Sequence, residues 1–197
     1  MATSEAYFIP PDQRWESGFL LRSYQPGDGA SLSEAVSASR DHLKTFLSWA
    51  MLEQSVERSE QLCRQSRAKW LSAEDFVIGI WEREGSRLLG GCGYHLREGR
   101  LELGNAEIGM WIRADAAGRG LGTAVLRALL GWGFTEWPWL RLSWRCSGAN
   151  LASQRLADKA GMQREGVLRS HAIDPGGQRR DTFCYAALRD EWLRATG

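Results

Sequence analysis

A glycine-rich segment, Gly118-Arg119-Gly120-Leu121-Gly122-Thr123, carries the clearest chemical signal in this sequence. Glycines let the backbone approach a ligand closely, and a helix that begins at such a loop leaves several backbone amides without partners. Together with the helix dipole, those amides favour a negatively charged group such as a diphosphate. The segment therefore predicts an anion-binding loop at a helix N-terminus. A glycine-rich turn without a ligand is the alternative.

Two well-known phosphate loops do not fit the spacing. The dinucleotide-binding pattern needs a glycine where Thr123 stands, and the Gly-Lys-Ser/Thr of a Walker loop is absent from the sequence. The chain has 25 Lys+Arg against 24 Asp+Glu, a formal charge of +1, so it has no overall field that attracts nucleic acid or an anionic membrane. We expect local anion binding and no nucleic-acid partner. The weak alternative is a nucleic-acid-binding surface made of Arg141, Arg145, Arg179 and Arg180.

The elements that position this loop follow from apolar periodicity and turn residues. Strands are expected at residues 18–24, 76–82, 88–96, 101–112, 140–146, 163–173 and 179–188. Helices are expected from Asp28 or Ser31 to about Ser39, and over residues 51–70, 116–132 and 150–160. This order predicts an α/β (α+β) domain, with a mixed, mostly antiparallel central sheet of about seven strands flanked by helices.

Length and composition limit the remaining possibilities. A chain of 197 residues predicts a single domain, residues 1–197, with residues 1–17 as an N-terminal extension. The first residues lack the features of a signal peptide, and no run approaches the roughly 18 apolar residues of a membrane helix, so we expect a cytoplasmic protein without membrane association. Four cysteines without ligand spacing predict no metal site. Most of the ten tryptophans are expected in the core or at its edge.

Several spaced motifs resemble the GNAT N-acetyltransferase superfamily. They are, in order, Ala106–Ile112, Gly118–Thr123, Asn150–Ser153, Lys159–Met162 and Glu165–Gly166. The segment Arg180–Tyr185, followed by Trp192, is similar to the RimJ/RimL-like branch, named for ribosomal-protein N-terminal acetyltransferases. The resemblance extends from Gly18 to Trp192. It implies acetyl-CoA as co-substrate in a cleft between the fourth and fifth strands, with direct transfer in a ternary complex to a primary amine of a protein N-terminus or a small molecule.

The same resemblance implies a set of cofactor contacts. They are Met110, Trp111, Ile112, Arg113, Gly118, Arg119, Gly120, Leu121, Gly122, Thr123, Asn150 and Ser153. A bulge in the fourth strand would free the Trp111 amide, next to Met110, to polarise the thioester carbonyl. Ala117 stands where the family has Gln or Arg, which should weaken the phosphate contact without abolishing it.

Two side chains match catalytic positions of the family. An ammonium group must lose a proton before it attacks, and Glu107 matches the glutamate that accepts it, directly or through a water. The alternative for Glu107 is an ion-pair partner of an arginine. Ser153, in Asn-x-x-Ser, could bond the coenzyme sulfur, because the tyrosine that many members carry is Ala157 here. The alternative for Ser153 is a local helix cap.

The resemblance also indicates where the acceptor binds. Phe46 and Trp49 are expected to form one wall of the acceptor pocket, with packing in the core as the alternative. Tyr94 and the final hairpin are expected to form the opposite wall. Glu107 would contact the acceptor amine. A possible homodimer would use the Trp-rich surface and that hairpin. Ala117 and Ala157 leave open a different function, a non-catalytic acyl-CoA-binding regulatory module.

Overall fold

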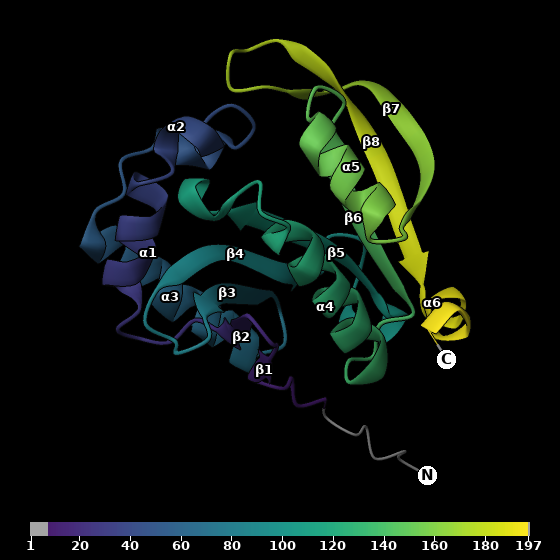
Figure 1. The fold of residues 1–197 in the computed structure, drawn as a ribbon, viewed down its shortest axis with the longest axis horizontal. Helices are drawn as coiled ribbons and strands as arrows, with labels where there is room; N and C mark the ends of the chain where they lie inside the picture. Colours follow the sequence, from purple (N-terminus) through teal and green to yellow (C-terminus); the bar gives the residue numbers. More distant parts are fainter. Residues whose placement is uncertain (1–7, 197) are drawn as a thin grey trace.

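The computed structural model describes residues 8–196, in which one mixed sheet contains eight strands in the order β1-β2-β3-β4-β5-β6-β8-β7 (Figure 1). The strands are β1 (Gln13–Trp15), β2 (Phe19–Ser23), β3 (Phe76–Glu82), β4 (Leu88–His95), β5 (Asn105–Ile112), β6 (Arg141–Ser147), β7 (Gln163–Ile173) and β8 (Arg179–Leu188). The α-helices are α1 (Gly29–Ser37), α2 (Arg40–Leu43), α3 (Val56–Leu71), α4 (Leu121–Thr135), α5 (Leu151–Lys159) and α6 (Arg189–Thr196). Short 3₁₀ helices are η1 (Ser48–Met51), η2 (Leu101–Leu103) and η3 (Ala114–Ala116).

The sheet is antiparallel except where β5 meets β6. The parallel pairing covers only Asn105–Glu107 against Arg141–Ser143. Beyond it, β5 continues to Ile112 and β6 to Ser147 without pairing with each other. The facing edges therefore keep backbone groups that no strand satisfies. This is the cleft that the sequence places between its fourth and fifth strands.

Helices cover both faces of the sheet. α1 and α3 pack on each other and over one face, where Leu20, Val36 and Trp81 share an apolar cluster. α4 covers the opposite face, and its Leu129 packs in the larger core with Ile108 of β5. Figure 1 shows α4 in front of β5 and α5 beside β6 and β8, with α1 on the far side of the sheet from α5. No helix within residues 8–196 is long and apolar enough to cross a membrane.

Tryptophan side chains form much of this core, as expected. The buried ones are Trp70, Trp81, Trp132, Trp137, Trp139 and Trp144. Trp15 and Trp49 are the large exceptions, 56% and 37% exposed. An exposed indole leaves a large apolar surface in water, which makes these two positions candidates for contact with another molecule.

The mixed, mostly antiparallel sheet and its flanking helices confirm the predicted fold class, with eight strands in place of about seven. The additional strand is β1, which lies inside the segment expected as an N-terminal extension and pairs with β2. Residues 1–7 of that segment lie outside the described residues. The helix expected over 51–70 begins at Val56, because the Ser55 hydroxyl caps it by accepting the Arg58 N–H. The helix expected over 116–132 begins at Leu121.

Candidate active site

The glycine loop closes one end of the cleft, between η3 and the first turn of α4. Gly118 and Gly120 have φ of 75° and 89°, which is strained for any other residue. Gly120 is the N-cap of α4, and no side chain caps this helix. The backbone N–H groups of residues 118–123 have no acceptor among the described residues. The loop therefore offers a row of unpaired donors at a positive helix end.

Backbone amides of β5 line the next part of the cleft. The β4–β5 register runs without a shift and ends in a bond from the Arg113 N–H to the Leu89 carbonyl, 2.8 Å. Backbone N–H groups point to alternate sides along a strand. Because the Arg113 N–H points to β4, the Trp111 N–H also points to β4, and the N–H groups of Met110 and Ile112 point to the cleft. The expected bulge at Trp111 is therefore wrong, and Met110 supplies the nearest free donor.

The side chains of β5 alternate between the two faces of the sheet. Met110 and Ile112 pack on the α4 side of the sheet, whereas Trp111 packs with the cluster under α1 and α3. Gly91 makes room for that indole, because a Cβ there would lie 2.5 Å from Nε1 of Trp111. One strand thus presents backbone donors to the cleft and an aromatic side chain to the other face.

The opposite wall comes from β6 and α5. Asn150 is the N-cap of α5, and its Oδ1 accepts the Ser153 N–H at 3.0 Å. The Ser153 hydroxyl takes no part in that cap; it accepts the Trp144 Nε1–H at 3.1 Å. Burial raises the pKa of the Cys146 thiol, and a hydrogen bond from Ser153 opposes the shift. The Ser153 hydroxyl is therefore tied to β6 through Trp144 and takes no part in the cap of α5.

Glu107 is the last residue of β5 that pairs with β6, and its side chain is only 5% exposed. Arg97 bonds one carboxylate oxygen. The other lies 3.6 Å from Nε of Arg145, which also pairs with Glu98 at 2.6 Å. Accepting a proton would break this network. The arrangement favours the alternative in which Glu107 is an arginine partner.

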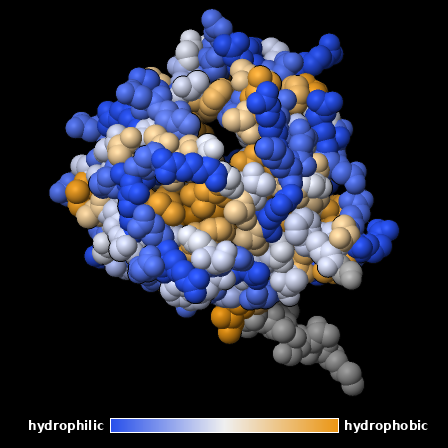
Figure 2. Space-filling view, in the orientation of Figure 1, coloured by the Kyte–Doolittle hydropathy of each residue, from blue (hydrophilic) through white to orange (hydrophobic). Residues whose placement is uncertain are grey.

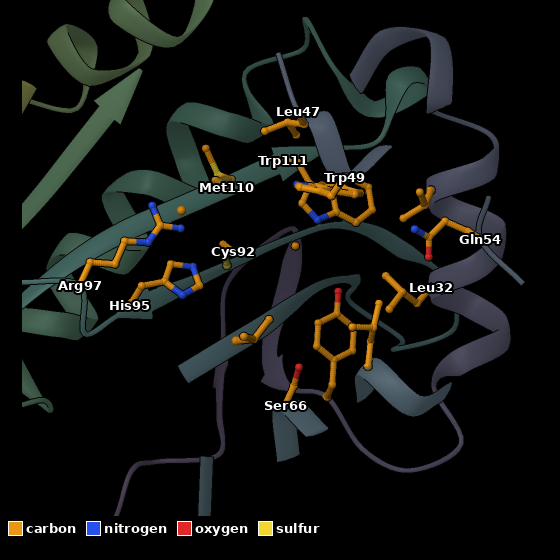
Figure 3. Close-up of a pocket in the computed structure, with 16 residues that line it drawn as sticks. Leu32, Leu47, Trp49, Gln54, Ser66, Cys92, His95, Arg97, Met110 and Trp111 are labelled. Carbon is orange, nitrogen blue, oxygen red and sulfur yellow. The ribbon is translucent and has the colours of Figure 1, made fainter. Parts of the chain in front are cut away.

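A cavity of about 380 Å³ opens on the face of β4 and β5 that α1 and α3 cover (Figure 3). Its walls are largely apolar: Leu32 and Val36 come from α1, Leu62 from α3, and Trp49 and Trp111 from η1 and β5. The two indoles meet edge to face, with ring centroids 6.0 Å apart. Gly109 and Met110 carry the lining to the edge of the cleft. Figure 2 shows an opening bordered by apolar surface between the parts of the molecule that carry α2 and α5.

Three predicted acceptor contacts are placed elsewhere. Tyr94 is wrong as a wall, because it is fully buried on the α4 face and donates to the Leu129 carbonyl at 2.6 Å. Phe46 is 40% exposed and does not line the cavity, whereas its neighbour Leu47 does. The final hairpin, β7 with β8, contributes no lining residue. Trp49 alone of the expected aromatic walls lines it.

The Arg113 side chain is also engaged elsewhere. Its guanidinium is buried and holds Glu34 of α1 with two N–H groups, one of them at 2.6 Å, and Asp115 at 3.0 Å. The side chain thus ties α1 to the sheet, and a cofactor contact of Arg113 stays a prediction that its backbone would have to meet.

Sequence reasoning missed Asp75 and Arg97, and it left His95 as one of three scattered histidines that could face the cleft but better fit surface or packing positions. His95 Nδ1 lies 2.7 Å from the Asp75 carboxylate, and both His95 and Arg97 line the cavity. The only signal was a histidine at the end of a predicted strand. Asp75 is twenty residues away in the chain, and the β3–β4 pairing brings it alongside.

Three of the four arginines of the nucleic-acid alternative are ion-paired, among them Arg145 with Glu98. Arg141 bonds Glu165 at 2.6 Å and Arg180 bonds Asp174 at 2.8 Å. Arg179 donates to the Ser170 carbonyl at 2.9 Å. They do not form a free basic surface. Among residues 8–196, no group of three His, Cys, Asp or Glu side chains could hold a metal ion.

A loop of unpaired amides, two strands that separate beyond Glu107, and an apolar cavity beside β5 together form the candidate active site. The family model for the acetyltransferase (GNAT) domain matches residues 18–163. The chain belongs to this family of N-acetyltransferases.

Individual proteins agree with this assignment. The chain is 33% identical over 86 residues to "Uncharacterized N-acetyltransferase YnaD" of Bacillus subtilis, a match that spans 44% of this chain and only half of that protein. It is 27% identical over 159 residues to "Uncharacterized N-acetyltransferase YoaA" of the same organism, covering 80% and 88% of the two chains. The crystal structure of RimL, a ribosomal L7/L12 α-N-protein acetyltransferase in complex with coenzyme A, matches with a TM-score of 0.80 at 19% identity over 91% and 97% of the two chains.

Proposed function

We propose that this protein transfers an acetyl group from acetyl-CoA directly to a primary amine of a protein N-terminus or a small molecule. The observation that carries the proposal is the parting of β5 from β6 beside the uncapped N-terminus of α4. Relatives in the family are named N-acetyltransferases, and the RimL structure holds coenzyme A.

The residues present fit such a co-substrate. The unpaired amides of residues 118–123 suit a diphosphate, and the exposed Arg119 adds a cation beside them. The open loop leaves room, since a Cβ at Gly118 or Gly120 would meet nothing within 4 Å. Bound there, acetyl-CoA supplies the acetyl group as a reactive thioester. Asn150 and Ser153 would face its pantetheine arm from the opposite wall.

In this transfer, the Met110 N–H and the Ser153 hydroxyl would each have a defined role. The Met110 N–H would donate to the thioester carbonyl oxygen as negative charge develops on it, the role of an oxyanion-hole donor. The Ser153 hydroxyl would donate to the leaving sulfur, supported by its bond from Trp144. Glu107 would hold Arg97 and Arg145 in place beside the cleft.

The test is acetyl-CoA-dependent thiol release, with acetyl-CoA binding followed in parallel by calorimetry. Acceptors are peptides with free N-termini, single amino acids, polyamines and aminoglycosides. Turnover on one of them, with an acetylated product of the expected mass, supports the enzyme. Binding of acetyl-CoA without turnover on any acceptor supports the regulatory module suggested by Ala117 and Ala157. Failure to bind acetyl-CoA contradicts both.

A further inference from the structure

The charges that line the acceptor-side cavity are few and specific. Among the described lining residues there is no Asp or Glu; the ionisable ones are Tyr24, Cys92, His95 and Arg97. Burial raises the pKa of both Tyr24 and Cys92, so these two stay neutral. Arg97 is positive and already bonded to Glu107. A molecule with several ammonium groups would find no counter-charge here and would meet a cation at one end.

The apolar wall of the cavity suits an aromatic or apolar ligand. Trp49 is 37% exposed and stands over the cavity against Trp111. Figure 3 shows these two indoles between the end that carries His95 and Arg97 and the end that carries Leu32 and Gln54. About 380 Å³ lies at the small end of the range for ligand pockets, about 300–1,000 Å³. The space suits one ring system or one large apolar side chain.

Among the described lining residues, His95 is the side chain with a ring nitrogen that can accept a proton from an amine. Its Nδ1 lies 2.7 Å from Asp75 Oδ1. A carboxylate only accepts, so Nδ1 carries the proton and Nε2 is left with a free lone pair. That nitrogen faces Gly109, where a Cβ would lie 2.8 Å from it. Gly109 therefore makes room for the imidazole and places Nε2 close to the β5 backbone, near the Met110 amide.

His95 and Glu107 are neighbours in the sheet but differ in their access to the cavity. Opposite His95 in the β4–β5 ladder stands Glu107, whose charge is taken up by Arg97 and Arg145. Its unbonded carboxylate oxygen is buried, and Glu107 does not line the cavity. The His95 side chain is 19% exposed and does. An amine in the cavity reaches the imidazole first.

We propose that this cavity receives a primary amine attached to an aromatic or bulky apolar group, and that His95, positioned by Asp75, takes the proton that the ammonium form loses. The proposal rests on the proposed acetyl transfer and names its acceptor class. That chemistry has two sources, a free arylalkylamine and a peptide whose first residue has a large apolar side chain.

The proton balance is complete without another reactant. The ammonium gives one proton to His95 Nε2, and His95 releases it to solvent. The neutral amine nitrogen attacks the thioester carbon; the N–C bond forms and the C–S bond breaks. The second proton leaves the nitrogen as the amide forms, and the leaving sulfur gains one proton to become the thiol. The products are the N-acetyl amide, free coenzyme A and one proton.

The first test compares acceptors by calorimetry and by thiol release. The probes are tryptamine, a peptide beginning with Trp, a peptide beginning with Gly, and spermidine. We expect tryptamine or the Trp peptide to bind and to be acetylated, the arms showing which source is used, and spermidine to do neither. Trp49→Ala should raise the Kd of the preferred probe about tenfold, the loss of a good aromatic contact, and leave acetyl-CoA binding unchanged. Trp15→Ala, at the other exposed tryptophan, should change neither.

The second test addresses the proton. His95→Gln should lower kcat about 100-fold with the preferred probe while its Kd stays the same. Asp75→Asn should also lower kcat, since an amide can donate to Nδ1 and leave the proton on Nε2, and Asp75→Glu should recover part of the loss. His171→Gln is the matched control, because His171 bonds Thr182 on the distant hairpin.

Each outcome decides. Stronger binding of spermidine or of the Gly peptide overturns the acceptor class, and so does a result in which neither tryptamine nor the Trp peptide is acetylated. A kcat unchanged in His95→Gln overturns the proton role. In those cases acetyl-CoA still binds and another acceptor is turned over, so the proposed function stands. Loss of acetyl-CoA binding in the unaltered protein would count against the proposed function itself.

Discussion

The indole N–H of Trp144 donates a 3.1 Å hydrogen bond to the hydroxyl of Ser153. The donation occupies one lone pair of the serine oxygen and leaves the hydroxyl proton available for a bond to another acceptor. Asn150 already caps α5, so this hydroxyl is not needed to stabilise the helix end. In the proposed acetyl transfer, this proton would assist the departure of the thiolate.

Ser153→Ala should therefore lower kcat without unfolding the protein. Loss of a proton donor to the leaving group costs about 100-fold. The Tm should change little, and the KM for acetyl-CoA should rise at most slightly. Steady-state thiol release measures the first effect. Ser72→Ala, which removes an exposed hydroxyl at the end of α3, is the control. An unaltered kcat in Ser153→Ala would return this residue to a packing role.

Gly120→Ala should weaken acetyl-CoA binding. Gly120 has φ of 89° as the N-cap of α4, so a side chain there strains the loop by about 1–2 kcal/mol or turns its amides away. We expect a Kd for acetyl-CoA about tenfold higher by calorimetry. Gly131→Ala is the matched control, because it lies inside the same helix, has open space for a Cβ, and should stabilise it by about 0.5–1 kcal/mol. Equal affinities in all three proteins would remove the loop from the binding site.

Much of the fold follows from local patterns. β7 and β8 coincide with their expected ranges because a turn with Asp174 and Gly177 separates two long strands. The glycine loop was predictable for a similar reason, since its spacing is local. Tyr94 was misplaced because β4 reads Leu-Leu-Gly-Gly-Cys-Gly-Tyr-His, with no polar face to show which side a residue occupies.

The rest of the site depends on contacts between distant parts of the chain. His95 meets Asp75 only after β3 and β4 pair, and Arg113 meets Glu34 only after α1 packs on the sheet. The phase of the Met110 amide depends on the register with β4. None of these relations leaves a periodic signal in the sequence, because each is fixed by tertiary packing.

The Glu34–Arg113 ion pair predicts a pH-dependent stability. The hydrogen bond from Arg113 lowers the pKa of the Glu34 carboxyl. A carboxyl with a lowered folded-state pKa stabilises the protein above its unfolded pKa, about 4.3, and this contribution is lost as pH falls through the folded value. Glu34 is largely exposed, so the effect is modest.

Glu34→Gln should consequently lower the Tm by about 2–4 °C at pH 7 and by less at pH 3. Thermal unfolding followed by circular dichroism at both pH values gives the comparison. The exposed Glu53→Gln serves as control and should show no such difference. A Tm deficit that grows toward acid pH would contradict the assigned role of the pair.

The variant Glu107→Gln distinguishes a catalytic base from a structural ion-pair partner, because the two roles predict different effects on kcat and on the Tm. As a base, Glu107→Gln would lose most of its kcat at an unchanged Tm, because the amide keeps the shape and loses only the proton-accepting charge. As the buried partner of Arg97 and Arg145, it should instead lower the Tm, since two guanidiniums lose their shared counter-charge. We expect the second result, a Tm lowered by several degrees with a smaller loss of kcat than His95→Gln causes. Glu98→Gln, which removes the other carboxylate on Arg145, should lower the Tm less because Glu98 is more exposed. If Glu107→Gln loses all activity while its Tm stays unchanged, Glu107 is the base and His95 does not have that role.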